Sequence, residues 1–540
     1  MNRSYGSRPA GQQEPLWLDR HLRARLASRF PHMPGVKHAG QAEQKDGSSL
    51  TSWLRLWQWE RLCSSLLRAG ENSLHYAGDP GLAHLRLLLE EAAITAGLAE
   101  KASCIPTGDI PYASLTGQGQ PNRYSFESAL SLVLSRLPFT LPDQLAVAPD
   151  SFLAVSHSDV SGVISLPTSG TTGAGKRIYC SESDLEQTAD FFRHGMQYMV
   201  LPERGDHVAL LMSGERPGSV GDLLLRGMQK LGVRCSVPGF VPLSPEGEDA
   251  MMDRLINLSP TCLVGVPGQL LVLARHSKAP LLAKSLRYVL LSGDAVTGST
   301  RSAIADGLDC EVFVHYGLTE TGLGGAVECR EHAGCHMREA DLIHEIVDES
   351  GIAVPAGEYG EIVITTLTRE AMPLIRYRTG DEGRIFEAPC SCGSALGRLE
   401  VRGRMSERVP LPCGGCLHIT DLDRILYALP SVRGYSAVLH GNGPGACLVL
   451  GLRFRRDASS QDVSSGSLAE AEQALSRLQG IQVSGKPADL RQNGALPVLV
   501  REEKDALPDS DDALHRRQAK QSILRTDKPM EGVLPLQTSP

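Results

Sequence analysis

Long apolar runs are missing from this chain of 540 residues. No stretch approaches the roughly eighteen consecutive apolar residues that a membrane-spanning helix needs, so no membrane partner is expected. The opening MNRSYGSRPAGQQEP also lacks the apolar core of a secretion signal, and a cytoplasmic location is the expectation. Basic residues are not in excess either, because 54 Lys and Arg stand against 62 Asp and Glu. The resulting net charge of -8 argues against a general nucleic-acid binder, and no nucleic-acid partner is expected.

The composition fits neither a disulfide framework nor a disordered chain. Thirteen cysteines, an odd number scattered along the chain, predict reduced thiols with a metal site among them. Hydrophobic residues at 41% and charged residues at 21% are ordinary globular usage. The length favours about three or four domains.

The texture of the sequence changes along the chain. Residues 1–50 are rich in Arg, Gly, Gln and Ser and predict a loosely ordered extension. Apolar positions at helical spacing predict helices from residue 53 and over 82–96. The segments VISLP, HVALLM, TCLVGVP, RYVLLSG and CEVFVHYG then alternate with helical patterns, which predicts a parallel α/β core, and shorter turn-punctuated strands after residue 355 predict an antiparallel or barrel-like subdomain. The predicted organisation is an extension at 1–50, an N-terminal α/β domain at 51–402, a small α+β C-terminal domain at 403–525 and a tail at 526–540. The C-terminal domain is predicted to contain a helix over 421–429 and a strand over 446–452.

The most informative segment is TSGTTGAGK, residues 168–176, which follows a strand candidate at 163–166. Its three glycines permit a tight turn that points N–H groups inward, and its hydroxyl groups add donors. Lys176 supplies a cation. The segment therefore predicts a phosphate cradle made by Thr168, Ser169, Gly170, Thr171, Thr172, Gly173 and Lys176.

Two other interpretations of this loop are open. Residues 170–176 satisfy the first part of a P-loop, but Arg177 stands where Ser or Thr should hold magnesium. A P-loop also opens directly into a helix, whereas RIYC favours a strand, with the next helix starting at Ser183 and Glu186 completing a capping box. Strand, loop, strand is favoured. A flexible hydroxyl-rich turn with no ligand is the remaining alternative.

TSGTTGAGK resembles the phosphate-loop signature of the adenylate-forming (AMP-binding) superfamily, with Gly175 where Pro is usual. Three further segments resemble its motifs in the expected order: HYGLTETG at 315–322, RYRTGD at 376–381 and RGRMSERV at 402–409. The phenylacetate-CoA ligase-like branch is the most similar, through WERLCSSLLRAGENSLHYAG, LPFTLPDQL, GEYGEIVITTL and AMPLIRYRTGD. The likeness runs from about residue 59 to 429 and only faintly to 524.

The resemblance implies an ATP-dependent acid-CoA ligase that forms an acyl-adenylate and then a coenzyme A thioester. Lys176 and the loop would hold the β and γ phosphates, Thr319 the α phosphate, and Glu320 a Mg²⁺ ion. Tyr316 would lie against adenine, edged by the turn of Ser292, Gly293 and Asp294. Gly317 would also bind the nucleotide, with Asp381 on the ribose and Arg404 assisting from the hinge. Taken alone, a Tyr after an apolar strand is usually core and a TGD triplet only a turn. Their joint occurrence favours the site.

The pattern weakens in the C-terminal segment. Ser406 stands where the family's hinge usually carries an acidic residue, with Glu407 beside it. The superfamily's catalytic lysine is matched best by Lys520 in RRQAKQSIL, where Ala519 replaces the usual Gly. A solvated helix charge is the simple alternative for Lys520.

Cysteine and histidine gather in ECREHAGCH at 328–336 and in CSCG at 390–393. Such clusters meet the tetrahedral demands of Zn²⁺, and some ligases of the resembled branch carry a Cys and His pair plus a CxCG. That resemblance implies a structural Zn²⁺ held by Cys329, His336, Cys390 and Cys392, with His332 and Cys335 as substitutes; unliganded thiols are the alternative. A second motif, CGGC at 413–416, is interpreted as a glycine turn with two free thiols rather than a redox pair.

The expected function is therefore ligation of a carboxylic acid with ATP, Mg²⁺ and coenzyme A, and analogy with the branch favours an aromatic acid. The acyl pocket is expected to involve residues 213–221 and those before Tyr316. Three rivals are open: transfer of the acyl group to a carrier protein or another acceptor, a non-catalytic nucleotide-binding partner protein, and a P-loop NTPase. The acid and the assembly are not determined by the sequence, and a homodimer is the candidate assembly.

Overall fold

The computed structural model describes most of the chain between residues 47 and 526. The described residues are 47–79, 123–166, 176–197, 199–214, 217–242, 244–441, 446–454, 463–486, 490, 495–502 and 523–526, with the isolated positions 22, 23, 25, 26, 82, 88, 89 and 92. The predicted extension and tail therefore lie mostly outside the described part, as does most of the helix predicted over 82–96. Within it, no helix is both long enough and apolar enough to cross a bilayer.

A helical layer opens the described chain. It consists of α2 (Gly47–Asn72), α3 (Leu74–Ala77) and α5 (Arg123–Arg136), followed by the short α6 (Pro142–Val147). The predicted helix at residue 53 is confirmed, although α2 begins at Gly47, inside the segment predicted as an extension. The indole of Trp57 donates to the carbonyl of Ala340 over 2.7 Å, and Ser65 Oγ donates to that of Thr366 over 2.8 Å. These bonds fix α2 against the subdomain that follows.

The central sheet has eleven described strands in the order β10-β11-β12-β13-β9-β8-β7-β6-β5-β3-β4. Its parallel half comprises β3 (His207–Leu210), β4 (Arg234–Ser236), β5 (Cys262–Gly265), β6 (Tyr288–Leu291) and β7 (Glu311–Tyr316). α7 (Glu182–Met196) precedes β3, and the helices between these strands are α8 (Val220–Leu231), α9 (Pro245–Leu258), α10 (Pro267–Ala274), α11 (Ala279–Leu282) and α12 (Gly298–Leu308).

Both faces of the parallel half are buried, as its near-continuous apolar strands require. Val208, Leu290 and Phe313 belong to one core cluster with residues of α7 and α8. Their neighbours Ala209 and Leu291 belong to a second cluster with residues of α9, α10 and α12. Alternate residues of each strand therefore face different helical layers. The predicted parallel α/β core is confirmed.

The other half of the sheet is antiparallel, as the turn-punctuated sequence predicts. It consists of β8 (Ala326–Glu328), β9 (Cys335–Met337), β10 (Leu342–Val347), β11 (Gly360–Thr366), β12 (Tyr377–Ile385) and β13 (Arg398–Arg404). β7 joins the two halves, because it pairs with β6 in parallel and with β8 in antiparallel fashion.

The segment around the glycine loop differs in two details from the sequence-based expectation. β1 (Gly162–Leu166) pairs antiparallel with β2 (Lys176–Cys180) and is not part of the parallel sheet. α7 begins two residues earlier than predicted, because the hydroxyl of Ser181 accepts from the Asp184 N–H and Asp184 completes the capping box in place of Glu186. The two predicted strands on either side of the glycine segment are confirmed, and a strand rather than a helix follows it, which removes the local structure of a P-loop.

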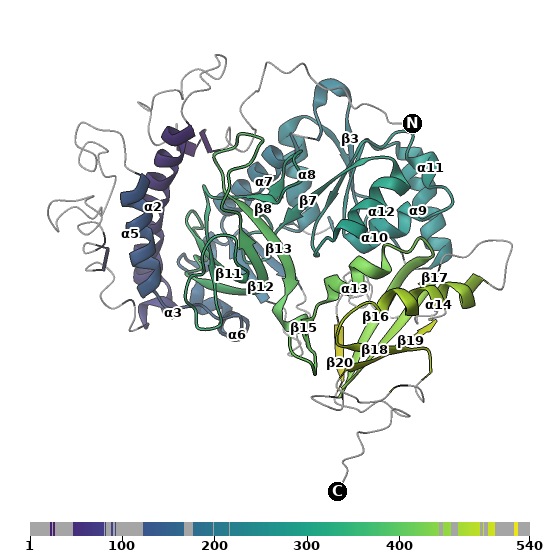
Figure 1. Ribbon diagram of the computed structural model, residues 1–540. Helices are drawn as coiled ribbons and strands as arrows, with labels where there is room; N and C mark the ends of the chain where they lie inside the picture. The colour runs from purple at the N-terminus through teal and green to yellow at the C-terminus, as the bar shows by residue number, and fades with distance from the viewer. Residues whose placement is uncertain are drawn as a thin grey trace, which may run out of the picture.

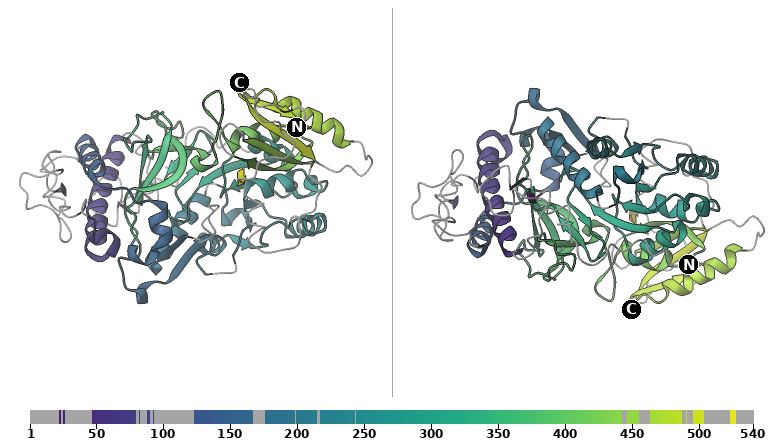
Figure 2. Two further views of the ribbon diagram at one scale, coloured as in Figure 1. Left: turned by 90° about the horizontal axis from the view of Figure 1, so that it is seen from below. Right: turned by 90° about the horizontal axis from the view of Figure 1, so that it is seen from above.

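A separate five-stranded sheet forms the C-terminal part, in the order β18-β19-β17-β16-β20. Its elements are β16 (Val432–His440), β17 (Cys447–Phe454), α14 (Val463–Leu475), β18 (Ile481–Ser484), β19 (Leu496–Glu502) and β20 (Ile523–Thr526), preceded by the hairpin β14 (Val409–Pro410) and β15 (Cys416–Leu417) and by α13 (Ile419–Leu426). Ser299 donates to the carbonyl of Arg424 over 2.7 Å, which links α12 to α13. Figures 1 and 2 show this sheet and the N-terminal helices at opposite ends of the molecule.

Candidate active site

The loop after β7 and the first residue of β2 meet at a buried ion pair. Nζ of Lys176 lies 2.8 Å from Oε1 of Glu320 and 2.7 Å from the hydroxyl of Tyr377. The Tyr377 hydroxyl in turn donates to Oε1 of Glu320 over 2.5 Å. Lys176, Glu320 and Tyr377, which come from three segments distant in the sequence, are thus in mutual contact.

Glu320 is ionised at this position. Burial would raise the pKa of Glu320, but the charge of Lys176, with hydrogen bonds from Lys176 and Tyr377, holds it below its ordinary value. Burial and the charge of Glu320 raise the pKa of Tyr377, so its hydroxyl remains a donor. A buried carboxylate that stays charged is suited to hold a hard cation.

A second contact group lies on β12 and β13. Asp381 and Arg404 are register partners on these strands, and Nε of Arg404 lies 2.8 Å from Oδ1 of Asp381. The Tyr316 hydroxyl donates to Oδ2 of the same carboxylate over 2.9 Å. The carboxylate of Asp381 is therefore oriented from both sides, by the end of β7 and by β13.

The two groups form one cluster. The charge of Asp381 raises the pKa of Arg404, and the charge of Glu320 adds to that effect. The same guanidinium therefore feels both carboxylates. The structure brings together the predicted residues Lys176, Tyr316, Glu320, Asp381 and Arg404.

The remaining described candidates lie at the ends of β6 and β7. Gly293 adopts a left-handed conformation with φ of 86°, which favours glycine in the turn that carries Asp294. A Cβ at Gly317 would approach the carbonyl oxygen of Leu323 to 2.2 Å, so only glycine fits there. Thr319 is buried beside Glu320. Ligands of α/β sheets bind outside the carboxyl ends of parallel strands, which is where these residues lie.

Other candidates fall outside the described residues. These are Thr168, Ser169, Gly170, Thr171, Thr172 and Gly173 of the glycine loop, and Lys520. Their assigned roles stay predictions.

Tyr377 was not among the sequence-based candidates, although it contacts both Lys176 and Glu320. Strand periodicity could have identified it, because residues 377, 379 and 381 alternate with outward positions on β12 and are all buried. A residue on the same face as Asp381, four positions earlier, is expected to face the same site.

The predicted metal ligands converge. Ligand atoms of Cys329, His336, Cys390 and Cys392 all lie within 4.8 Å of one another. The sulfur atoms of Cys329 and Cys390 are 3.7 Å apart, and Nε2 of His336 lies 3.2 Å from Sγ of Cys392. Nδ1 of His336 donates to the carbonyl of Leu396 over 3.1 Å, which leaves Nε2 directed at the sulfur atoms. The donor set and its spacing fit a tetrahedral Zn²⁺.

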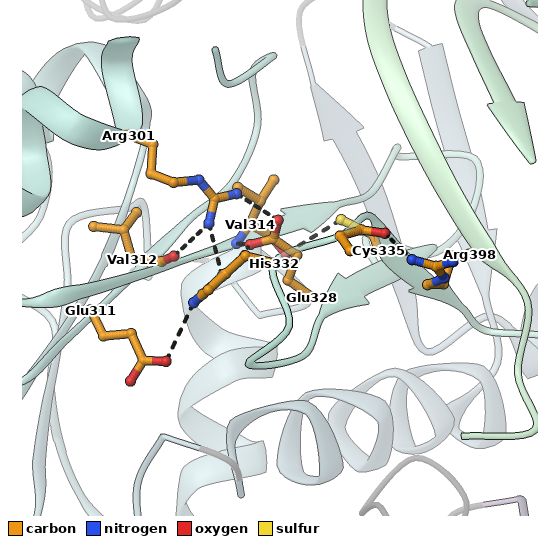
Figure 3. A network of polar contacts seen from close by, with 9 residues as sticks. Arg301, Glu311, Val312, Val314, Glu328, His332, Cys335 and Arg398 are labelled. Atoms are coloured by element: carbon orange, nitrogen blue, oxygen red, sulfur yellow. Dashed lines mark hydrogen bonds and ion pairs between the residues drawn. The ribbon is translucent and has the colours of Figure 1, made fainter. Parts of the chain in front are cut away.

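His332 and Cys335, the two substitute metal ligands predicted from the sequence, lie elsewhere, in a polar network between α12, β7 and β8 (Figure 3). His332 contacts Glu328 and Glu311 over 3.3 Å each, and Arg301 bonds Glu328 over 2.5 Å. Cys335 donates to the carbonyl of Val314. Hydrogen bonds to Glu311 and Glu328 raise the pKa of His332 to about 9, and these contacts, with Arg301 at 2.9 Å from Nδ1, hold it in the network and away from the metal ligands. The network braces β7 just before Tyr316.

The CGGC motif forms the turn between β14 and β15. Gly414 and Gly415 have φ values of 93° and 79°, and Cys413 and Cys416 are exposed, free thiols. The interpretation as a glycine turn with two free thiols is confirmed.

Comparisons with known proteins find similar sequences. A family model described as "AMP-binding enzyme" matches residues 156–368. A phenylacetate-coenzyme A ligase of Thermus thermophilus is 28% identical over 319 residues, which are 55% of this chain and 67% of that protein. The Pseudomonas putida enzyme of the same name is 28% identical over 50% of this chain and 61% of its own length. The Escherichia coli enzyme of that name is also 28% identical, and the match spans about half its length, 54%.

The fold is also that of a solved protein. A 2-hydroxyisobutyryl-CoA ligase in its postadenylation state, in complex with 2-HIB-AMP, superimposes with a TM-score of 0.60 at 16% identity, over 99% of this chain and 95% of that one. This chain therefore shares its fold with that ligase. The chain resembles AMP-binding enzymes through residues 156–368, and phenylacetate-coenzyme A ligases over about half of its length. The recognition and the fold class predicted from the sequence are confirmed.

Proposed function

We propose that the chain is an ATP-dependent acid-CoA ligase that works through an acyl-adenylate. A carboxylate oxygen of the acid attacks the α phosphorus of ATP, and pyrophosphate leaves with its bonding electron pair. The sulfur of coenzyme A, having lost its proton, then attacks the acyl carbon, and AMP leaves with the original carboxylate oxygen. No oxidant or reductant is consumed.

The observation that carries this proposal is the convergence of Lys176, Glu320 and Asp381 on one cluster. Phosphoryl transfer needs positioning and charge neutralisation more than covalent chemistry. Lys176 would neutralise phosphate oxygens, and Asp381, held by Tyr316 and Arg404, presents acceptor oxygens suited to ribose hydroxyls. Thr319 would donate to the α phosphate.

The contacts of Glu320 in this cluster can change when a nucleotide binds. Oε1 of Glu320 accepts from both Lys176 and Tyr377 in this structure. When phosphate oxygens pair with Lys176, the ionised carboxylate of Glu320 would be available to hold Mg²⁺, a cation that prefers oxygen ligands. The ion would add charge stabilisation at the phosphates. Tyr377 would keep the carboxylate oriented during that exchange.

Zn²⁺ is proposed at Cys329, His336, Cys390 and Cys392 as a structural ion. Four protein ligands leave no coordination position for water, which is typical of structural rather than catalytic zinc. The site would join the β9 segment to the loop before β13. β13 ends at Arg404, so the ion would stabilise the strand that positions the ribose-side guanidinium.

An aromatic acid is proposed as substrate because the curated relatives are named phenylacetate-coenzyme A ligases. The test is a panel of carboxylic acids incubated with ATP and Mg²⁺, with and without coenzyme A, followed by separation of AMP, ADP and thioester. Acid-dependent AMP with a coenzyme A thioester is expected. AMP without thioester would indicate a carrier or another acceptor, ADP would indicate an NTPase, and nucleotide binding without turnover would indicate a non-catalytic protein; each of these contradicts the proposal.

A further inference from the structure

Arg376 has an unusual backbone conformation directly before a residue of the site. Its φ of 44° lies in the left-handed region, which residues other than glycine rarely adopt. Arg376 is also buried, with 4% of its surface exposed. Such a conformation persists only where the surrounding contacts hold it, and it occurs most often at functional sites. The next residue is Tyr377, whose hydroxyl contacts both Lys176 and Glu320.

The side chain of Arg376 is held by groups that lie outside the site. Nε and Nη2 lie 3.2 Å and 3.0 Å from the two carboxylate oxygens of Glu345 on β10. Nη1 donates to the carbonyl of Leu137 over 3.0 Å, and the guanidinium lies 4.0 Å from the ring centroid of Phe139. A bidentate pair of this kind fixes the orientation of the guanidinium as well as its position.

The backbone around Arg376 is hydrogen-bonded on both sides. The N–H of Arg376 donates to Oγ1 of Thr365 over 3.0 Å, and its carbonyl accepts from the N–H of Thr140 over 3.1 Å. Oγ1 of Thr140 donates to the carbonyl of Ile375 over 2.6 Å. The N–H of Ile375 donates to the hydroxyl of Tyr76 over 3.0 Å. The N–H and carbonyl groups of both residues therefore have partners, which keeps the backbone in the left-handed conformation.

These contacts determine where the ring of Tyr377 lies. Tyr377 is fully buried, and it pairs with Thr140 in a parallel bridge. Its hydroxyl is the far end of the side chain, so a rotation of the backbone at Arg376 would move it by more than a hydrogen bond tolerates. The contacts of 2.5 Å with Glu320 and 2.7 Å with Lys176 therefore depend on the conformation of Arg376.

We infer that Arg376 is a positioning residue for the reaction. Its pair with Glu345 holds the left-handed backbone that aims the hydroxyl of Tyr377 at Glu320 and Lys176. This inference rests on the proposed ligase function and adds a residue that acts on the same site without touching the substrate.

The test is a double-mutant cycle measured by acid-dependent exchange of labelled pyrophosphate into ATP at saturating ATP. Tyr377→Phe and Arg376→Ala are each expected to lower the exchange rate by about tenfold, the scale of one hydrogen bond. If Arg376 acts through Tyr377, the double variant is also expected to lose about tenfold, whereas independent effects would multiply to about a hundredfold. A purely structural contribution of Arg376 would not produce that coupling.

Two milder variants complete the cycle. Arg376→Lys keeps a cation for Glu345 but not the bidentate pair, so it is expected to recover part of the lost exchange. Glu345→Gln leaves Arg376 in place with a neutral acceptor, and it should show the same non-additivity with Tyr377→Phe at a smaller amplitude. If Arg376→Ala does not fold, the Glu345→Gln cycle decides the question by the same criterion.

Arg287→Met is the matched control. Arg287 also pairs with a buried carboxylate, that of Asp206, but at the amino ends of β3 and β6, whereas the site lies at the carboxyl ends. It is expected to lower the melting temperature and to combine with Tyr377→Phe as a simple product of the two single effects. Unchanged exchange in Arg376→Ala, or a double variant that loses about a hundredfold, overturns the inference while the ligase proposal stands. Absence of acid-dependent exchange in the parent chain with every acid overturns both.

Discussion

Nζ of Lys176 lies 2.8 Å from Oε1 of Glu320, although 144 positions separate the two residues in the sequence. The pair joins the start of β2, which follows the glycine loop, to the loop after β7. Both side chains are largely buried, with 14% and 8% of their surfaces exposed. A buried cation and carboxylate in contact are costly to desolvate, which indicates that they are kept for what they do.

Glu320→Gln and Lys176→Met are each expected to lower acid-dependent pyrophosphate exchange by about 10²–10³-fold, because each removes a charge aimed at the reacting phosphates. Isotope exchange between labelled pyrophosphate and ATP measures this. Lys230→Met is the matched control, since Lys230 also pairs with carboxylates, at Glu186 and Asp190, but on the surface of α8. Retained exchange in Glu320→Gln would contradict the assignment.

Asp381→Asn is expected to weaken ATP binding by about tenfold, because the neutral amide loses its charge-assisted contact with Arg404 and is a poorer acceptor for ribose hydroxyls. Equilibrium binding of ATP, measured by calorimetry, provides the readout. Glu400→Gln serves as control, because Glu400 also pairs with an arginine across β12 and β13, at 2.7 Å from Arg384. Equal losses in both variants would assign Asp381 a purely structural role.

Two neutral imidazoles predict the acid sensitivity of the fold. The pKa values of His315 and His344 are both lowered to about 4 by burial. In the unfolded chain a histidine has a pKa of about 6.5, so below that pH the unfolded chain binds protons that the native chain does not. The free energy of unfolding therefore falls as the pH drops from about 6.5 towards 4, by roughly 1.4 kcal/mol per pH unit for each histidine. The melting temperature between pH 7 and 5 should decline less steeply in His344→Leu than in the parent chain. An identical slope would argue against a neutral His344.

The metal site predicts about one Zn²⁺ per chain. Cys390→Ser should lose the metal and lower the melting temperature, since a structural ion contributes directly to folding stability. Cys413→Ser is the control, because Cys413 is exposed in the β14–β15 turn. Elemental analysis of the purified chain together with thermal unfolding, before and after treatment with a chelator, gives both quantities. Full zinc content in Cys390→Ser would remove this residue from the ligand set.

Local sequence patterns were sufficient for much of this site. Glycines and strand patterns predicted the strands on either side of the glycine segment. The resemblance to the adenylate-forming superfamily implied the grouping of Tyr316, Glu320 and Asp381 and the four metal ligands that include His336. These features depend on residues close in sequence or on motifs with fixed partners.

Contacts that depend on long-range packing were not predictable in the same way. His332 was a candidate metal ligand, but Glu311 and Glu328, brought to it by the pairing of β7 with β8, hold it in a polar network instead. The start of α7 was misplaced because two serines, Ser181 and Ser183, both precede acidic residues three positions on.

The most direct test is to measure whether an oxygen atom of the acid's carboxylate is transferred to AMP. A carboxylic acid that the chain turns over is labelled with ¹⁸O in its carboxylate and incubated with ATP, Mg²⁺ and coenzyme A, and the nucleotide product is weighed by mass spectrometry. An acyl-adenylate path predicts AMP that carries one ¹⁸O from the acid. Unlabelled AMP, or ADP as the product, would contradict the claim that Lys176, Glu320 and Asp381 surround one nucleotide cleaved at its α phosphorus.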